Sequence, residues 1–311
     1  MDVQEVRTDE LTSAQRDDLT ALMARRFAVD EHPALPDPQR LALSSGDGIG
    51  APHPIFRLLL VTEAATLRGC GVLSTAGDGS LALHIVIDPD QADPSAVRHV
   101  ITKRAVAIAL DLVTPLRLWI MQATADDDNA VAADGFTPDR ELIQMRVPLP
   151  LPAELLAQTR PVTTRPFIPG QDEQAWLDIN NRAFAGHPEQ GGWTEAELRE
   201  RLAADWVVLD GFLMADAPDG SGLVGSCWTK IHRLTHPPMG EIYVISVNPD
   251  RQGQKWGKSL TVAGLNWLAQ QGLTVGMLYT DADNTAAVAM YHALGFADHH
   301  IDRAYLYAKV D

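Results

Sequence analysis

The stretch EIYVISVNPDRQGQKWG, residues 241–257, contains a strand, a loop and the start of a helix in one continuous run. β-Branched and aromatic residues predict a strand over residues 241–247, which Asn248-Pro249 ends. A loop containing Gly253 and Gly257 follows, and apolar residues at helical spacing predict a helix over 258–268. This order predicts an α/β or α+β fold, in which helices cover a mixed sheet.

The loop of this stretch has the features of an anion site. Backbone N–H groups at a helix start have no partner within the helix, and the helix dipole favours negative charge there. Arg251, Lys255 and Lys258 add positive charge, although the formal net charge of the chain is −16. Gly257 would let an anion approach the backbone closely. The sequence therefore predicts a diphosphate site, with a solvated basic patch as the alternative.

A second informative segment is NTAAVAMYHALGF, residues 284–296. Asn284 is a typical N-cap, and Gly295-Phe296 is typical of a left-handed helix end with a hydrophobic contact. One face of the intervening helix is apolar and holds Ala287, Val288, Tyr291 and Leu294. Tyr291 is therefore predicted to point inward, either as a core residue or as a functional phenol.

The two halves of the chain share landmarks at one spacing. LALHIVIDPD, residues 81–90, matches EIYVISVNPD, residues 241–250, with Pro89 and Pro249 160 residues apart (249 − 89). The same offset relates Gly135-Phe136 to Gly295-Phe296 and Trp119 to Tyr279. Strands are predicted at 58–62, 69–74 and 81–87 in the first half, and at 206–210, 223–229 and 241–247 in the second. This repeat predicts a duplication.

Prolines mark the boundary between the halves, within residues 147–169. The predicted domains are residues 1–150 and 161–311, joined by a linker at 151–160. After Asp88-Pro89-Asp90, the first half has an acidic loop without glycine or basic residues, which is a poor diphosphate site. The first domain is therefore predicted to be structural.

Composition limits the class of protein. The chain has 311 residues, of which 46% are hydrophobic and 21% charged, and no apolar run reaches the roughly 18 residues that span a bilayer. Its acidic balance argues against nucleic acid, and the acidic N-terminus lacks a signal pattern, so a cytoplasmic location is expected. A monomer is expected as well, although no sequence feature reports the oligomeric state. Cys70 and Cys227 are predicted core residues. His292, His299 and His300 lack zinc-ligand spacing, so no metal is expected.

The turn after residue 247 resembles the acyl-coenzyme A site of GNAT-superfamily acetyltransferases. That family has Q/R-x-x-G-x-G/A here, where this chain has Gln252-x-x-Lys255-x-Gly257, with lysine at the first glycine position. The resemblance implies tandem GNAT domains, acetyl-CoA as co-substrate, and Tyr291 as the acid that protonates the departing thiolate. It also implies cofactor-binding residues, namely Ile245, Ser246, Val247, Gln252, Gly253, Gln254, Lys255, Trp256, Gly257, Lys258, Asn284, Ala286 and Ala287.

Four segments, HPEQGGW at 187–193, CWTK ending at Lys230, GEIYVISV at 240–247 and MYHALGF at 290–296, resemble the mycothiol synthase family. That family acetylates the cysteinyl amine of desacetylmycothiol. The resemblance implies Glu241 as the general base or its water-positioning partner, and the amide of Val247 as a donor to the thioester carbonyl. It implies an acceptor site formed by Asp37, Glu189, Lys230, Glu241 and Tyr279.

Two alternatives to this function are open. One is a tandem acetyltransferase of another small amine, such as an aminoglycoside or a polyamine, and the other is a non-catalytic acyl-CoA sensor. Glu241 together with Tyr291 favours catalysis over sensing, and HPEQGGW favours mycothiol chemistry over other amines.

Overall fold

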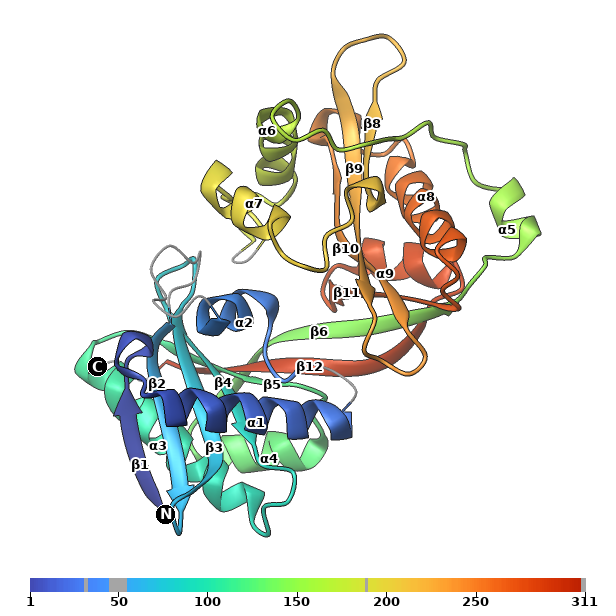
Figure 1. The fold of residues 1–311 in the computed structure, drawn as a ribbon. Helices are drawn as coiled ribbons and strands as arrows, with labels where there is room; N and C mark the ends of the chain where they lie inside the picture. The colour runs from blue at the N-terminus through green and yellow to red at the C-terminus, as the bar shows by residue number, and fades with distance from the viewer. Residues whose placement is uncertain (31–32, 45–54, 188–189, 309–311) are drawn as a thin grey trace. The chain divides into compact units, whose positions relative to one another are not determined.

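The computed structural model describes residues 1–30, 33–44, 55–187 and 190–308. The chain forms two compact units, drawn in Figure 1. Unit 1 contains Met1–Glu141 and Ile301–Asp311, and unit 2 contains Leu142–His300. These units differ from the domains expected at 1–150 and 161–311. Residues 142–148, at the end of the first half, pair with residues 275–281 of unit 2, and residues 303–307, at the end of the second half, pair with residues 116–120 of unit 1. In the part of the chain that the structure describes, no helix is both long and apolar enough to cross a bilayer.

Unit 1 is a sheet with strand order β1-β2-β3-β4-β5-β12, in which β4 and β5 are parallel and the other neighbours antiparallel. Its elements are β1 (Asp2–Val6), η1 (Thr8–Glu10), α1 (Ser13–Asp30), α2 (Asp37–Ser44), β2 (Ile55–Glu63), β3 (Thr66–Thr75), β4 (Leu81–Ile87), α3 (Pro94–Asp111), β5 (Leu116–Ile120), α4 (Ala125–Ala133), the start of β6 (Thr137–Pro148) and most of β12 (Ala297–Tyr307).

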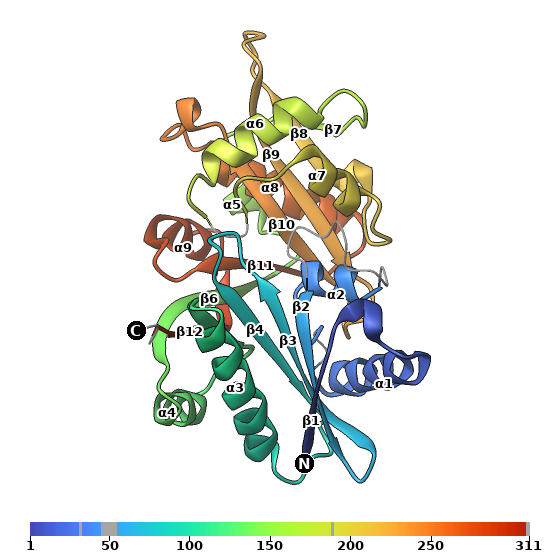
Figure 2. The same ribbon diagram turned by 90° about the vertical axis from the view of Figure 1, so that its left-hand side faces the viewer.

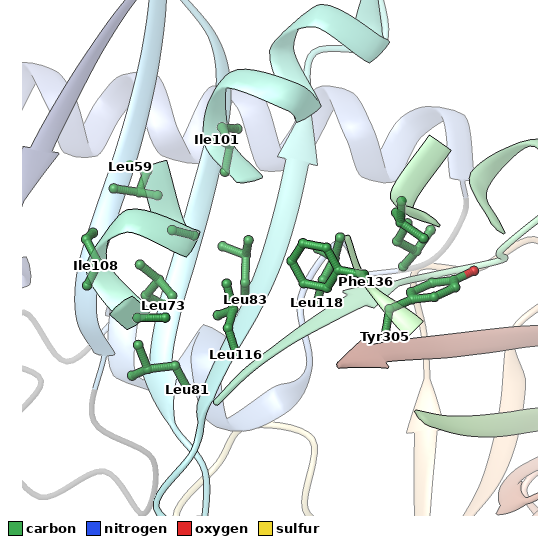
Figure 3. Packing of buried hydrophobic residues seen from close by; sticks show 14 of the residues in the cluster. Leu59, Leu73, Leu81, Leu83, Ile101, Ile108, Leu116, Leu118, Phe136 and Tyr305 are labelled. Atoms are coloured by element: carbon green, nitrogen blue, oxygen red, sulfur yellow. The ribbon is translucent and has the colours of Figure 1, made fainter. Parts of the chain in front are cut away.

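The sheet of unit 1 buries a different side-chain set on each face, because successive side chains of a strand point to opposite faces. Leu59, Leu73 and Leu83 pack beneath α3, as Figure 3 shows with Ile101 of that helix. The alternate residues of the same strands, such as Leu58 and Leu60, pack with α1 on the other face. In Figure 2, α1 and α3 lie on opposite sides of the sheet.

Unit 2 repeats this plan with strand order β6-β11-β10-β9-β8-β7, in which β10 and β11 form the parallel pair. Gly135 and Gly295 both have φ +89°, so the equivalent helices of the two units end in the same left-handed turn. The predicted duplication is confirmed by this shared order. The elements of unit 2 are α5 (Ala153–Ala157), β7 (Arg165–Pro166), α6 (Glu173–Ala183), α7 (Glu195–Leu202), η2 (Leu209–Gly211), β8 (Phe212–Asp216), β9 (Leu223–His232), β10 (Met239–Val247), η3 (Pro249–Arg251), α8 (Trp256–Gln270), β11 (Val275–Asp281) and α9 (Thr285–His292).

The two faces of the unit 2 sheet differ in their cover. A Cβ added to Gly264 of α8 would lie 2.5 Å from Sγ of Cys227 and 2.7 Å from Cδ1 of Ile242, so α8 packs directly on that face. Trp176 of α6 packs with Trp228 on the opposite face. Figure 1 shows α6 and α8 on opposite sides of β9 and β10. Cys70 and Cys227 are both fully buried, as predicted.

The predicted strand at residues 206–210 is wrong. The chain turns there, since the N–H of Val207 bonds to the carbonyl of Ala204, and the strand is Phe212–Asp216. The segment is apolar because its side chains pack in the core and not because it forms a strand. The Trp206 ring, for example, packs on Trp228 and Tyr243. The other five predicted strands and the helix at 258–268 lie within observed elements.

Candidate active site

The loop between β10 and α8 is a cluster of unpaired backbone donors. No acceptor in the described part of the chain meets the N–H groups of residues 253–258. Gly253 has φ +77° and Lys255 has φ +64°, and these turns bring the amides to the start of a 15-residue helix. Consecutive free amides at a helix start form an anion-binding concavity. The backbone thus fits the predicted diphosphate site.

Lys255 stands where the GNAT pattern has its first glycine, and the structure gives the reason for that glycine. With φ +64° and ψ 18°, Lys255 is left-handed, a conformation that costs a non-glycine residue about 1–2 kcal/mol. The backbone at Lys255 therefore has the left-handed conformation that a glycine adopts readily. Arg251, by contrast, donates to Ser221 and pairs with Asp219, so the basic patch at the loop reduces to Lys255 and Lys258.

Lys255→Gly is expected to leave the thermal midpoint of unfolding unchanged or raised by about 1–2 °C, because relief of the left-handed strain exceeds the added chain entropy. Lys258→Gly removes the same charge from the first turn of α8, where glycine is unfavourable by about 1 kcal/mol, and should lower the midpoint by about 2–4 °C. Differential scanning calorimetry of both variants measures this. An equal fall of the thermal midpoint in both variants would contradict the backbone strain at Lys255.

β10 and β11 separate shortly after they pair. Their parallel ladder holds only Gly240 with Gly276 and Glu241 with Met277, although β10 continues to Val247. On the opposite edge of β10, where it pairs with β9, a register shift between Ile242 and Val244 produces a bulge at Tyr243. Bulges of this kind redirect side chains and are common beside active sites. The β10 backbone beyond Tyr243 therefore has no ladder partner from β11 within the described chain.

Glu241 lies on the sheet face opposite α8, since Gly240 and Ile242 face that helix. Its Oε2 is 2.7 Å from Nε2 of His232, and both side chains are largely buried. Lys230 pairs with Glu241 across the β9–β10 ladder and so shares its face. Glu241, the residue predicted as the base, therefore lies in a polar cluster with His232 and Lys230.

Two aromatic rings lie beside the ammonium of Lys230. Its Nζ is 4.8 Å from the Trp206 ring centroid and 5.3 Å from that of Tyr243. Such cation–π contacts stabilise a lysine that is 6% exposed and would otherwise be costly to bury. Sequence reasoning missed His232, Trp206 and Tyr243, because their roles depend on the register of β9 and β10.

Tyr291 is 5% exposed on α9, and its ring packs edge-on against Phe296. Burial, with a smaller contribution from the neighbouring Cys227 thiol, raises the pKa of the Tyr291 hydroxyl well above its usual range. Cys227 faces α8, so Tyr291 approaches on the sheet face opposite Glu241. No hydrogen-bond partner for this hydroxyl is found among the described residues. The phenol therefore stays protonated at physiological pH.

The remaining predicted site residues have different settings. Tyr279 of β11 lies on the Glu241 face, by the register with Met277, and its hydroxyl accepts a hydrogen bond from Gln144 at 2.7 Å. Asp37 begins α2 in unit 1 and pairs with Arg40. Glu189 lies outside the described residues.

The cofactor residues that the resemblance implied are located on three elements. Ile245, Ser246 and Val247 end β10, and Gln252 to Lys258 form the donor loop and the start of α8. Asn284 caps α9, since its Oδ1 accepts from the N–H of Ala287, and Ala286 lies in the same first turn. Trp256 packs under the guanidinium of Arg160, at 4.1 Å, so its backbone rather than its ring is open to a ligand.

The HPEQGGW segment is anchored at both ends. His187 Nε2 is 3.2 Å from Oδ2 of Asp281 at the end of β11. Trp193 exchanges hydrogen bonds with the Asn181 side chain of α6. A Cβ on Gly191 would lie 2.2 Å from the carbonyl oxygen of Phe184, so only glycine fits there. The described residues at the two ends of this segment are therefore held by specific contacts.

The corresponding loop of unit 1 makes its own side-chain contacts and lines a cavity. Asp93 caps α3 by accepting from the N–H of Ala96, and Asp88 pairs with Arg25. A cavity beside β4 and β5 contains Arg26 and Arg98 among its lining residues. Each of these arginines pairs with an aspartate, Asp30 and Asp127 respectively. Among the described residues of the chain, no group of three or more His, Cys, Asp or Glu side chains could hold a metal.

Comparisons with known proteins identify the family of this chain. Residues 174–296 match the acetyltransferase (GNAT) family model. Mycothiol acetyltransferase of Streptomyces avermitilis is 39% identical over 300 residues, covering 95% of this chain and 92% of that protein. Mycothiol acetyltransferase of Arthrobacter sp. (strain FB24) is 37% identical, covering 90% and 88%.

Solved structures support the fold. A tandem GNAT protein from the clavulanic acid biosynthesis pathway superposes with a TM-score of 0.72 at 13% identity, covering 98% of each chain. A GCN5-related N-acetyltransferase from Sphaerobacter thermophilus gives a TM-score of 0.68 at 17% identity, covering 98% of this chain and 95% of that one. Tandem GNAT architecture, as predicted, is therefore confirmed.

Proposed function

Since this chain belongs to the mycothiol acetyltransferase family, we propose that it transfers the acetyl group of acetyl-CoA to the cysteinyl amine of desacetylmycothiol. One observation carries the proposal at the level of residues. A buried carboxylate, Glu241, lies on the sheet face opposite α8, and a buried phenol, Tyr291, neighbours Cys227, which faces α8. Amine deprotonation and thiolate protonation need such a base and acid on either side of one thioester.

Acetyl-CoA is the co-substrate that the loop and β10 fit. The free N–H groups of residues 253–258 would bind its diphosphate, with Lys255 and Lys258 supplying charge. The backbone of β10 from Tyr243 to Val247 would hydrogen-bond the amides of the pantetheine arm, since no β11 ladder competes for it there. The amide of Val247 would donate to the thioester carbonyl as charge develops on its oxygen.

Transfer then follows from the placement of the two side chains. Glu241 removes a proton from the acceptor ammonium, directly or through a water, and so creates a nucleophilic amine. The amine forms the new C–N bond as the C–S bond breaks. Tyr291 donates its proton to the departing sulfur, where a thiolate would otherwise be left in a dry site.

Polar groups around Glu241 suit a polyhydroxylated acceptor. We include Lys230 and Tyr279 among the acceptor contacts because both lie on the Glu241 face of the sheet. Asp37 and Glu189 are proposed on family resemblance. Buried hydrogen-bonding groups discriminate strongly against ligands that leave them unpaired, which favours a sugar-bearing acceptor over a simple polyamine. Unit 1 is proposed to have a structural role.

Gly257→Ala tests the diphosphate site, because the added Cβ would meet only Sδ of Met290 at 3.6 Å and Cγ2 of Val247 at 3.9 Å. These are ordinary contacts, so we expect the thermal midpoint to be kept and the Kd of acetyl-CoA to rise about tenfold or more, since the methyl hinders approach to the amides. Isothermal titration calorimetry measures the affinity.

Gly264→Ala is the matched control on the same helix. Its Cβ would lie 2.5 Å from Sγ of Cys227, so this variant should lose stability instead. Unchanged acetyl-CoA affinity in Gly257→Ala would contradict the assignment of this loop.

The proposed reaction is tested by its product. Purified protein is incubated with acetyl-CoA and desacetylmycothiol, and the separated product is analysed by mass spectrometry and thiol titration. N-Acetylation predicts one added acetyl group and a product thiol that still reacts. A product with no reactive thiol would indicate S-acetylation, and absence of product would contradict the function.

A further inference from the structure

His232 forms the shortest described contact of the proposed base. Nε2 of His232 lies 2.7 Å from Oε2 of Glu241, with the two side chains 13% and 10% exposed. His232 is the last residue of β9 and pairs with Met239, two residues before Glu241 on β10. Because register partners share a face, the contact is built into the ladder rather than made by a mobile side chain. The mechanism above does not use this imidazole.

The chemistry of the contact determines its direction. An ionised carboxylate only accepts hydrogen bonds, so the ring nitrogen that faces it must carry the proton. His232 therefore donates Nε2–H to Oε2 of Glu241.

We propose that His232 is a positioning residue for Glu241, which holds Oε2 so that Oε1 takes the proton of the acceptor amine. The inference rests on the proposed function of Glu241. In the step, an N–H bond of the ammonium breaks, an O–H bond forms at Oε1, and the Nε2–H to Oε2 hydrogen bond persists.

Two substitutions test the positioning role. His232→Gln keeps an N–H donor, whereas His232→Phe removes it. At pH 8 we expect kcat within about threefold of the unsubstituted protein for His232→Gln and about 10- to 100-fold lower for His232→Phe. The KM of both substrates should stay within about twofold, because the donor acts on the base and not on binding.

The decisive readout is the split between kcat and KM at pH 8. The loss in His232→Phe should lie in kcat alone, and the donor of His232→Gln should restore kcat, because the contact orients the base and does not bind substrate. His236→Gln, at an exposed histidine of the hairpin after β9, is the matched control and should keep the original kcat and KM.

Each outcome has one reading. A kcat of His232→Gln as low as that of His232→Phe would overturn the inference, as would an unchanged kcat in His232→Phe. A parallel loss of acetyl-CoA affinity and thermal midpoint in both variants would indicate a purely structural role and also overturn it. Failure of the unsubstituted protein to acetylate desacetylmycothiol would instead contradict the proposed function, and so the two failures are distinguishable.

Discussion

Glu241→Gln is expected to lower kcat for acetyl transfer by about 10²- to 10⁴-fold, the contribution typical of a positioned general base. The amide is nearly isosteric with the carboxylate and accepts the same hydrogen bond from His232 at its oxygen, so the ladder and the fold should persist. It does not take a proton from an ammonium. Steady-state assay of free coenzyme A thiol, with both substrates saturating, measures the loss.

Two further observations make the Glu241 result specific. The Kd of acetyl-CoA should stay within about twofold, because the proposed diphosphate and pantetheine contacts are backbone groups elsewhere on β10 and α8. Glu195→Gln, at the exposed start of α7, changes the same functional group and should keep full kcat. Retention of more than about a tenth of the activity in Glu241→Gln would remove this residue from the base role.

Tyr291→Phe is expected to lower kcat by about 10²- to 10³-fold, because the departing thiolate would lose its proton donor. The ring keeps its edge-on packing with Phe296, and no described hydrogen bond of the hydroxyl is lost, so stability should be nearly unchanged. Stopped-flow measurement of thiol release, with acetyl-CoA affinity determined in parallel, separates chemistry from binding. Tyr307→Phe, in unit 1, is the matched control and should retain kcat.

The pH dependence of the unsubstituted protein gives a second check on Tyr291. Burial raises the pKa of this phenol, so the protonated donor is fully present below that pKa and is lost only as the pH rises through it. No basic limb of kcat attributable to Tyr291 is therefore expected below about pH 10. A limb centred near pH 8.5 that disappears in Tyr291→Phe would contradict this buried setting.

Local signals in the sequence predicted the elements around the site because local chemistry determines them. Asn284 and Gly295 define the ends of α9 through a side-chain cap and a left-handed turn, and both are observed. The 160-residue repeat (249 − 89) predicted two units with one plan. Lys255 looked like a departure from the family turn, yet its left-handed backbone retains the conformation that glycine would adopt there.

Long-range pairing was harder to predict. The residues at 206–210 have strand composition, but their apolar character serves ring packing on Trp228 and Tyr243. The exchange of β6 and β12 between the sheets has no local signal, since a strand sequence does not specify its partner. The His232–Glu241 contact likewise depends on the register of two strands. The expected monomeric state stays a prediction.

Acceptor selectivity tests the proposed reaction most directly. The measurement is kcat/KM for desacetylmycothiol, spermidine and an aminoglycoside, followed as coenzyme A thiol release at saturating acetyl-CoA. We expect kcat/KM to be at least about 100-fold higher for desacetylmycothiol, because buried polar groups around Glu241 would lose their partners with the other amines. Equal or higher kcat/KM for spermidine or the aminoglycoside would contradict the account.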